Sequence, residues 1–270
     1  MKKYFCLLTM FLMISLTMSA QASGGQITRK KANTTAATAA PKTKTSKPHS
    51  SGQSNKSSGT TSGKPVRSLS MRRVNGFEAI DLGLSVKWAS CNVGASKPEE
   101  SGNHYAWGET KTKRDYSWAT YFDVANTGLK EGLYGYTRES FKKYSYLDRL
   151  LSKEDDAATV IWGSSWRIPT NKEYQELWDL PHKWEVLNGV HGIRFTSANG
   201  NSIFLPAVVV SKNDSVILND TDGVYWTSEI YQDDHDTSEH AYAWWVNSDL
   251  GGWNSVDRCY GLSIRPVTNK

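Results

Sequence analysis

Residues 162–178 read WGSSWRIPTNKEYQELW and hold the clearest structural signal in the chain. Pro169 favours extended geometry at the residue before it, so a short strand should end there. Thr170, followed three residues later by Glu173, is a capping box, which predicts that a helix begins directly after the threonine. The apolar side chains that follow at helical spacing share one face of that helix: Tyr174, Leu177 and Trp178. The segment therefore predicts a strand that turns into an amphipathic helix, and it contains no evident catalytic group.

The N-terminal segment, residues 1–22, has the pattern of a secretory signal peptide. Two lysines precede an apolar run from Tyr4 to Met18, and small residues follow, with cleavage expected after Ala20 or Ala22. The alternative is a membrane anchor, but the apolar run holds about 15 residues and a spanning helix needs about 20. We therefore expect an exported protein, at the cell surface, periplasmic or extracellular, with no stable membrane span after cleavage.

Residues 23–73 form a second compositional region, with 11 Lys and Arg and no acidic residue. Ser, Thr, Lys, Gly, Ala and Pro dominate it, and such a composition buries too little apolar surface to fold. We therefore predict a disordered basic tether. It is either a solvated linker or a segment that contacts anionic polymers or lipid head groups of the cell envelope.

Residues 74–270 are expected to form one domain of opposite charge. They hold all 27 Asp and Glu and 19 of the 32 Lys and Arg, a net charge of −8, although the whole chain is at +5. An acidic surface repels phosphates, so nucleic acid is not an expected partner. All 11 Trp also lie in this part, which predicts a sizeable aromatic core.

The pattern of apolar residues predicts an α+β domain with a mainly antiparallel sheet. Residues 79–82 and 85–90 have the alternation of short strands, and an Asn-Gly pair between 192–197 and 202–205 predicts a hairpin. Further strands are expected at 224–228, 241–247 and 262–267, with a turn at 251–253. Helices are expected over residues 140–151 and, after a second capping-box signature at 152–155, over residues 157–162.

WRIPTNKEY, residues 166–174, resembles the signature of formylglycine-generating-enzyme-like domains, which have a C-type-lectin-like fold. Motifs across the whole domain together resemble the Fibrobacter succinogenes major paralogous domain, found in exported proteins of Bacteroidota-type bacteria. These motifs are EAIDLGLSVKWASCNVGA (78–95), WGET (107–110), DDAATVIWGSSWRIPT (155–170), VYWTSE (224–229) and YGLSIRPV (260–267). The resemblance implies a C-type-lectin-like fold: a small twisted, mainly antiparallel sheet with two helices, long loops, and first and last strands that pair. It also implies a lectin-like binding or adhesion function.

Cys91 and Cys259 are the only cysteines left after removal of the signal peptide. In an exported protein such a pair forms a disulfide or remains as two buried free thiols. The pairing of first and last strands that the resemblance implies would bring the two residues near one another, which favours the disulfide.

Enzymatic chemistry is not expected. Formylglycine-generating enzymes use two cysteines in their C-terminal portion, whereas this chain has only Cys259 there. Related iron-dependent oxidases use three clustered histidines, and no pair at helical spacing occurs among the five of the domain: His104, His182, His191, His235 and His240. No nucleophile-base signature or phosphate-binding loop is evident either. An oxidase remains the enzymatic alternative, and a purely structural envelope protein is a third possibility.

Two segments suggest calcium. Trp253, Asn254 and Ser255 resemble the W-N-D motif of calcium-dependent lectins, but a serine replaces the charged ligand and the partner E-P-N tripeptide is missing. The acidic loop 232–240 carries the densest set of potential ligands: Asp233, Asp234, Asp236 and Glu239. That loop either holds a divalent ion or is simply a solvated, charged loop.

Aromatic residues near the C-terminus suggest sugar binding without a metal. Trp244 and Trp245 are adjacent in a predicted strand and therefore point to opposite faces, so one of them must face solvent, a loop or a ligand. By analogy with lectins, residues 229–254 should form the ligand surface, and the expected ligand is a glycan or else a surface protein. The candidate ligand-binding residues are Trp244, Trp245, Asp249, Trp253 and Asn254. Arg265 is expected to be structural, paired with carbonyls or with a carboxylate such as Glu109.

Overall fold

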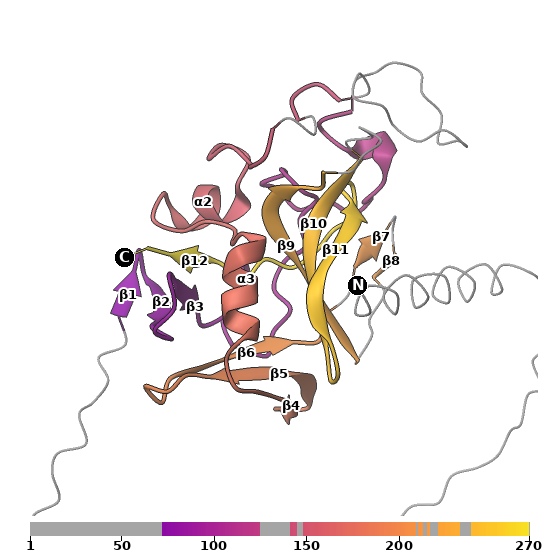
Figure 1. Cartoon of the computed structure of the whole chain (residues 1–270). Coiled ribbons are helices and arrows are strands. Elements are labelled where there is room, and N and C mark those ends of the chain that lie inside the picture. The colour runs from indigo at the N-terminus through magenta and orange to yellow at the C-terminus, as the bar shows by residue number, and fades with distance from the viewer. Residues whose placement is uncertain are drawn as a thin grey trace, which may run out of the picture. The chain divides into compact units, whose positions relative to one another are not determined.

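The computed structural model describes residues 72–124, 141–144, 148–208, 210–212, 215–216, 221–232 and 239–269 (Figure 1). The predicted signal peptide and nearly all of the predicted tether lie outside these residues. Arg72 and Arg73, which composition assigned to the tether, instead begin the first strand, β1 (Arg72–Val74). None of the helices in the described part of the chain is long and apolar enough to cross a membrane.

The first sheet contains both ends of the described chain. Its strand order is β1-β2-β3-β12, with β2 (Phe77–Ile80), β3 (Lys87–Ala89) and β12 (Val267–Thr268), and all neighbours are antiparallel. An Asn-Gly pair turns β1 into β2, with positive φ at both residues, as two-residue hairpin loops require. The predicted strands at 79–82 and 85–90 correspond to β2 and β3. The last strand pairs with β3 rather than with β1.

A second antiparallel sheet, β4-β5-β6, confirms the predicted hairpin. Its strands are β4 (His182–Leu187), β5 (Val190–Thr196) and β6 (Ser202–Pro206). Asn188 and Gly189, at φ 51° and 88°, form the turn between β4 and β5. A short two-stranded ribbon follows, β7 (Ser211–Lys212) with β8 (Ser215–Val216).

The third sheet, β11-β10-β9, is the one that positions the candidate site. It consists of β9 (Asp222–Ile230), β10 (His240–Asn247) and β11 (Gly251–Asp257), all antiparallel. The predicted strands at 224–228 and 241–247 are therefore confirmed. The predicted turn at 251–253 is wrong, because the Asn247 side chain closes the turn earlier, accepting the backbone N–H groups of Asp249 and Leu250 at 3.0 and 2.8 Å. The chain then enters β11 at Gly251.

The helices are short, and their caps differ in part from the expectation. In α3 (Asn171–Trp178) the capping box of Thr170 and Glu173 is present as predicted. The expected helix at 157–162 is α2 (Ala157–Trp162), but Asp156 caps it, accepting the N–H of Thr159 at 2.9 Å. The second capping-box signature at 152–155 therefore does not begin a helix. A single 3-10 turn, η1 (Trp118–Thr120), completes the set in the described part.

Two further expectations are corrected. Over the described parts of 140–151 no helix forms, because Phe141 is bridged to Val124 and Leu150 to Glu229. Residues 262–267 do not form one continuous strand. They make isolated bridges, Tyr105 with Leu262 and Tyr225 with Ser263, before β12 begins. Local alternation cannot distinguish a strand from a chain that touches several neighbours in turn.

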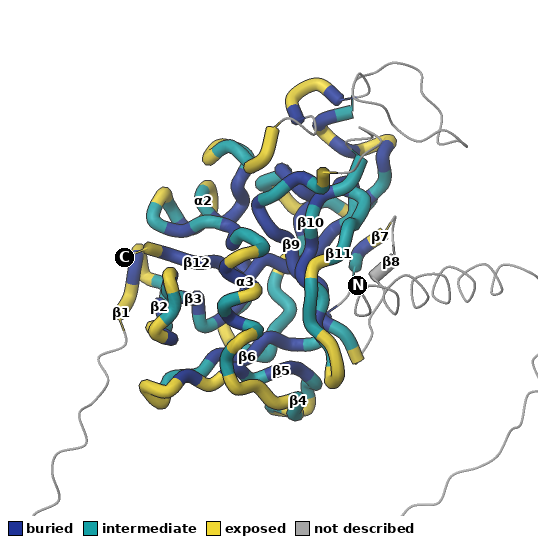
Figure 2. The backbone as a smooth tube through the Cα atoms, in the orientation of Figure 1, coloured by how far each residue is buried: buried dark blue, intermediate teal, exposed yellow. Residues whose placement is uncertain are grey.

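The core lies on both faces of the sheet β9–β11, and Figure 2 shows β9 and β10 largely buried. On one face α3 covers the sheet, and the Tyr174 ring stacks on Trp244 with centroids 5.6 Å apart. The other face packs against a second cluster that contains Trp107, Trp166 and Trp226. The prediction of a mainly antiparallel sheet accompanied by two helices is confirmed for the described residues, an arrangement consistent with an α+β domain.

Arg265 has the structural role expected of it. The side chain is fully buried, and its Nε donates to Asn92 Oδ1 at 2.8 Å. Its remaining nitrogens donate to the backbone carbonyls of Ala89, Ser90 and Phe204. Glu109 is not its partner and pairs with Lys113 instead, at 2.8 Å.

Cys91 and Cys259 are both buried and are not joined by a disulfide, so the structure has two thiols where the resemblance implied a disulfide. The backbone register keeps them in different places. Next to Cys91, the Val93 amide bonds to the Ile264 carbonyl, whereas the carbonyl preceding Cys259 accepts from Trp107. Cys259 thus packs in a separate aromatic cluster with Tyr116, Trp118, Tyr121 and Phe141. The two thiols are the alternative that the sequence left open.

Candidate functional site

The adjacent residues Trp244 and Trp245 point to opposite faces of β10, as the strand geometry predicted, and both are packed. Trp244 is 1 % exposed beneath α3. Trp245 packs against the cluster on the other face, and its Nε1 donates to Asp222 Oδ1 at 2.7 Å. Trp244 was therefore wrongly proposed as a ligand residue, because the helix already occupies its ring.

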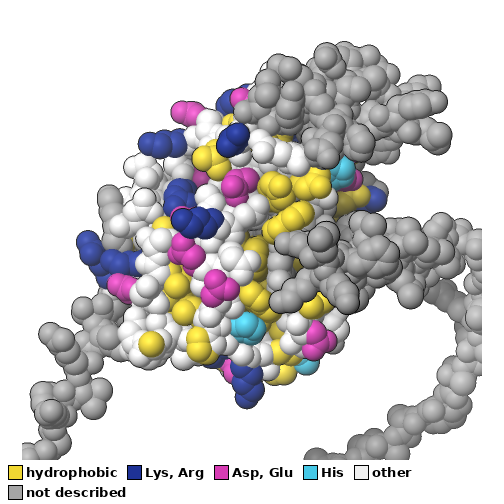
Figure 3. All heavy atoms as spheres, in the orientation of Figure 1, with side chains coloured by type: hydrophobic (Ala, Val, Ile, Leu, Met, Phe, Trp, Pro, Cys, Tyr) yellow, Lys and Arg dark blue, Asp and Glu magenta, His cyan; other side chains and the backbone are white. Residues whose placement is uncertain are grey.

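The face that α3 covers has an open half. Along β10, His240, Tyr242 and Trp244 stand directly opposite three residues of β11: Asp257, Ser255 and Trp253. Directly opposite residues of antiparallel strands point to the same face of a sheet, so these six side chains form one ladder. The helix covers the Trp244 end, while Trp253 on the outer strand is 46 % exposed. Figure 3 shows hydrophobic side chains gathered at the surface over β10 and β11.

Three aromatic rings form the centre of this surface, which we call the aromatic patch: Tyr231, Tyr242 and Trp253. Tyr242 is edge-on to both of the others, at centroid distances of 5.0 Å from Tyr231 and 5.3 Å from Trp253. Tyr231 and Trp253 are 6.4 Å apart. Burial raises the pKa of Tyr242, and the nearby Tyr231 and Glu229 add to the effect, so its hydroxyl stays protonated at neutral pH. The two tyrosines hold Trp253 while leaving nearly half of it in solvent.

Three carboxylates lie near the patch, and we call them the acidic rim: Glu229, Glu239 and Asp257. His240 connects two of them, with Nε2 3.1 Å from Asp257 Oδ1 and Nδ1 3.7 Å from Glu239 Oε1. Glu229 accepts the N–H of Asn171 at the start of α3 at 2.5 Å. The side chains of Glu239 and Asp257 remain 21 % and 30 % exposed, so both can reach a bound molecule.

Two further predicted ligand residues have other roles or positions. Asn254 accepts the N–H of Ser255 at 2.8 Å. Among the described residues β11 pairs only with β10, so this bond satisfies a backbone group at an otherwise open sheet edge. Asp249 is exposed in the β10–β11 turn, where its N–H is bonded to Asn247. The turn lies beyond the helix-covered end of the ladder, so Asp249 is not part of the aromatic patch.

The predicted metal loop is only partly visible. Asp233, Asp234 and Asp236 lie outside the described residues, and Glu239 belongs to the acidic rim. Within the described part of the chain, no group of three or more His, Cys, Asp or Glu is arranged to hold a metal ion.

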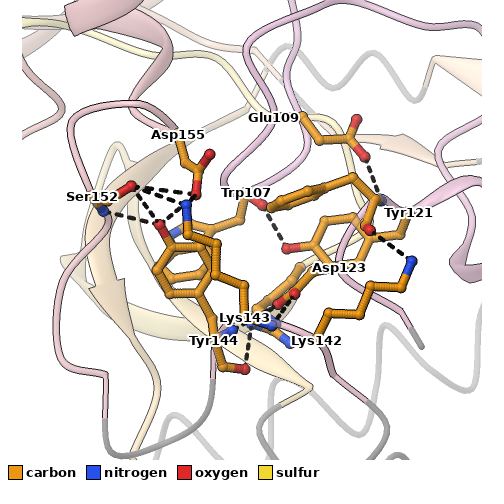
Figure 4. A network of polar contacts seen from close by, with 11 residues as sticks. Trp107, Glu109, Tyr121, Asp123, Lys142, Lys143, Tyr144, Ser152 and Asp155 are labelled. Atoms are coloured by element: carbon orange, nitrogen blue, oxygen red, sulfur yellow. Dashed lines mark hydrogen bonds and ion pairs between the residues drawn. The ribbon is translucent and has the colours of Figure 1, made fainter.

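A second polar network, which sequence reasoning missed, joins residues 143–144 to residues 152–155 (Figure 4). Tyr144 and Lys143 both donate to Asp155, each at 2.5 Å, and the N–H of Ser152 donates to the Tyr144 hydroxyl. Hydrogen bonding to Asp155 raises the pKa of Lys143, and burial raises that of Tyr144. Both groups are therefore protonated at neutral pH, so neither acts as a base or nucleophile there.

Beneath this network lies a fully buried ion pair of Asp123 and Arg258, with Oδ2 and Nη1 3.3 Å apart. The guanidinium also stacks on the Phe141 ring, 3.8 Å from its centroid. Asp123 further accepts the N–H groups of Lys143 and Tyr144. The network thus anchors residues 141–144 to the body of the domain. From the sequence, only the high aromatic content of this part of the domain was evident. The residues that bond to one another in the network are far apart along the chain, so no local pattern predicts their contacts.

His104 and Ser211 form a pair with the residue types of a nucleophile and its base. His104 Nδ1 lies 2.6 Å from Ser211 Oγ. Ser211 is only 3 % exposed, and burial lowers the pKa of His104. A nucleophile must reach its substrate, and this hydroxyl is closed off, so the pair acts as a neutral internal hydrogen bond.

The described residues form a domain of mainly antiparallel sheets with two short helices, and it presents an aromatic patch with three neighbouring carboxylates at the edge of one sheet. Comparison with known proteins found no matching family model, no matching curated protein and no matching solved structure.

Proposed function

We propose that the domain is an exported, non-enzymatic binding module with a C-type-lectin-like fold, related to the Fibrobacter succinogenes major paralogous domain, and that it binds a glycan. The observation that carries this proposal is the aromatic patch. Trp253 leaves 46 % of its surface in solvent while two tyrosines brace it. A large aromatic ring that is half exposed and held by two other rings offers a sugar a flat apolar surface, which supports the proposal.

The chemistry of the patch suits a sugar. The C–H groups of a sugar ring carry partial positive charge and pack on the electron-rich face of an aromatic ring. The hydroxyl groups of further sugar units along β11 then find hydrogen-bond acceptors in Glu239 and Asp257, which flank His240. No metal is required by this arrangement.

A protein partner is the second candidate. Sheet edges often bind proteins by adding a strand, and β11 is such an edge. However, the Asn254 side chain already occupies the Ser255 N–H, which weakens the edge as a template. This observation favours recognition by the face of the sheet over recognition by its edge.

The test is a glycan array, probed with the domain in the presence and absence of EDTA. Binding that survives EDTA supports aromatic stacking, whereas binding lost with EDTA supports a calcium site, with Glu239 and the neighbouring aspartates 233, 234 and 236 as its ligands. If no glycan binds, the proposal of a glycan ligand is wrong, and a protein partner or a structural envelope role is favoured instead. Copper or iron in the purified domain, found by elemental analysis, would instead favour the oxidase alternative.

The matched variants are Trp253→Ala and Leu250→Ala. Both residues lie in the same hairpin and are about equally exposed, at 46 % and 48 %. Trp253→Ala should weaken glycan binding at least tenfold, as loss of a stacking platform does. Leu250→Ala should leave it unchanged. Equal losses in the two variants would show that the patch is not the site.

A further inference from the structure

The patch has a charge as well as a shape. We infer that the aromatic patch selects its glycan by charge, binding neutral and amine-bearing sugars and excluding sugars that carry carboxylate or sulfate groups. The inference rests on the proposed function and names the substrate class of the same site.

Two carboxylates lie on the same side of the sheet as Trp253. Asp257 stands two residues from Ser255 and four from Trp253, on the same face of β11, because alternate residues of a strand point the same way. Glu239 precedes β10 and reaches the same histidine as Asp257. Four residues of a strand span about 13 Å, so an oligosaccharide that stacks on Trp253 and extends along β11 passes these two charges.

Glu229 adds a third charge from β9, which pairs with β10 on the side away from β11. It raises the pKa of Tyr242, behind the larger effect of burial, which places its charge within electrostatic reach of the aromatic rings. The ring faces themselves carry negative electrostatic potential. An anionic sugar would therefore meet repulsion from both the platform and its rim, whereas an ammonium group would be attracted by both.

Two basic residues of the described part of the chain can be placed beside the patch from its contacts. His240 is held between Glu239 and Asp257. Arg149 is exposed, and its backbone carbonyl accepts the N–H of Ile230, next to Tyr231. These two residues stand against three carboxylates in a domain whose sequence has a net charge of −8. The balance at the patch is therefore negative.

The size of the effect follows from exposed ion pairs. Each partly exposed carboxylate should change affinity about two- to fivefold for a ligand that carries one charge at contact distance. Several charges together should separate neutral from anionic oligosaccharides by tenfold or more at low salt. Because the Debye length falls from about 10 Å at 0.1 M to about 3 Å at 1 M salt, the difference should shrink as salt is raised.

The experiment uses four β-1,4-linked hexasaccharides that share one backbone and differ in charge: hexaglucosamine, hexa-N-acetylglucosamine, cellohexaose and hexaglucuronate. Calorimetry at neutral pH and low salt should give the tightest binding for hexaglucosamine and intermediate binding for the two neutral hexamers. Hexaglucuronate should bind at least tenfold more weakly than cellohexaose. In 1 M salt the four affinities should converge toward those of the neutral pair.

Two aspartate variants separate the patch from the overall charge of the domain. Asp257→Asn and Asp249→Asn change the net charge equally, but only Asp257 is in the acidic rim. Asp257→Asn should narrow the gap between cellohexaose and hexaglucuronate at least twofold, and Asp249→Asn should leave it as in the wild type. Equal narrowing in both variants would mean that the charge of the whole domain, and not the rim, sets the preference.

The results distinguish a failure of charge selection from a failure of glycan binding. If hexaglucuronate binds as tightly as cellohexaose, and Trp253→Ala weakens both, charge selection is wrong while glycan binding at the patch stands. If none of the four hexamers binds the folded wild-type domain, both charge selection and the glycan proposal are overturned.

Discussion

Trp244 and Trp253 stand directly opposite one another on neighbouring strands and on the same face of one sheet, yet their surroundings differ completely. Trp244 is 1 % exposed and stacked on Tyr174, whereas Trp253 is 46 % exposed and braced by two tyrosines. A tryptophan therefore belongs to the core on β10 and to the surface on β11, at the same position of the ladder. The difference is that the short helix α3 covers β10 at this position and leaves Trp253 exposed.

The position of α3 decides this division. Its C-terminal end presses so closely on β11 that a Cβ at Gly251 would lie 2.3 Å from the Trp178 ring, so only glycine fits there. Its N-terminal end is held by Glu229. A helix of eight residues cannot cover a three-stranded sheet, and the part of the ladder toward Asp257 stays open. The candidate site is thus the portion of a core-forming face that the helix leaves uncovered.

The strongest test of this division is Trp244→Ala. Removing a fully buried tryptophan should cost about 3–5 kcal/mol in the free energy of unfolding, because a large cavity opens beneath α3. Urea denaturation followed by circular dichroism measures the change. A loss below about 1 kcal/mol would mean that the helix does not pack on this half of the face as the structure shows.

The second test weakens the helix itself through Glu173→Gln. Burial alone would raise the pKa of Glu173, but hydrogen bonds from Arg167 and Thr170 outweigh it and hold the pKa below its usual value. A glutamine still forms the capping box, so the variant removes mainly the charge. We expect a loss of about 2 kcal/mol at neutral pH, typical of a hydrogen bond to a buried charge.

The contribution of the Glu173 charge to the free energy of unfolding depends on pH. A carboxylate whose pKa is depressed by folding stabilises the folded state above the unfolded-state value, here about 4.5. This stabilisation disappears as the pH falls through the lower, folded-state pKa. Wild type and Glu173→Gln should therefore differ at pH 7 and converge in acid. A difference that stays constant down to the acid limit would contradict the role of the charge.

Those parts of the fold that depend on neighbouring residues were predictable from the sequence. The Thr170–Glu173 capping box and the hairpin of β5 and β6 are present where the residues predicted them. Two further Asn-Gly pairs, Asn75-Gly76 and Asn188-Gly189, form hairpin turns by the same rule and could have been predicted. The second capping signature failed because Asp155 bonds to Lys143 and Tyr144 rather than to a helix terminus.

The site was predictable only in outline. Strand alternation indicated that Trp244 and Trp245 face opposite ways, and the C-terminal half does hold the exposed ring. Alternation could not show that both of those rings are packed, since a sheet with a core on each face buries both sides of a strand. The partnership of Trp253 with Tyr231 and Tyr242 depends on the register of three strands, which no local pattern encodes.

The third test returns to the exposed member of the pair with Trp253→Ala. The lost contacts with Tyr231 and Tyr242 should cost only about 1 kcal/mol of stability, the scale of aromatic pairs at a surface. Trp244→Ala should therefore lower stability more, whereas Trp253→Ala should lower glycan binding more. The same urea titration measures the stability of both variants, and calorimetry measures their binding. A loss for Trp253→Ala as large as for Trp244→Ala would place Trp253 in the core instead.

The smallest expected effect concerns the strand that carries the patch. The backbone N–H of Asn247 donates to the Leu250 carbonyl, so Asn247 and Leu250 form a hydrogen-bonded pair of the two strands, while the N–H of Leu250 bonds to the Asn247 side chain. Hydrogen-bonded and non-hydrogen-bonded pairs alternate along antiparallel strands, so the Ser255 N–H points away from β10. Asn254 satisfies that N–H. Asn254→Ala should therefore lower stability by only about 0.5–1 kcal/mol. It should also increase concentration-dependent self-association, measured by analytical ultracentrifugation, because the freed N–H leaves a sheet edge open to pairing.

The control is Asn247→Ala, because Asn247 has the same side chain but closes the turn. This variant should lower stability without promoting self-association. Equal self-association in both variants would assign the effect to general destabilisation.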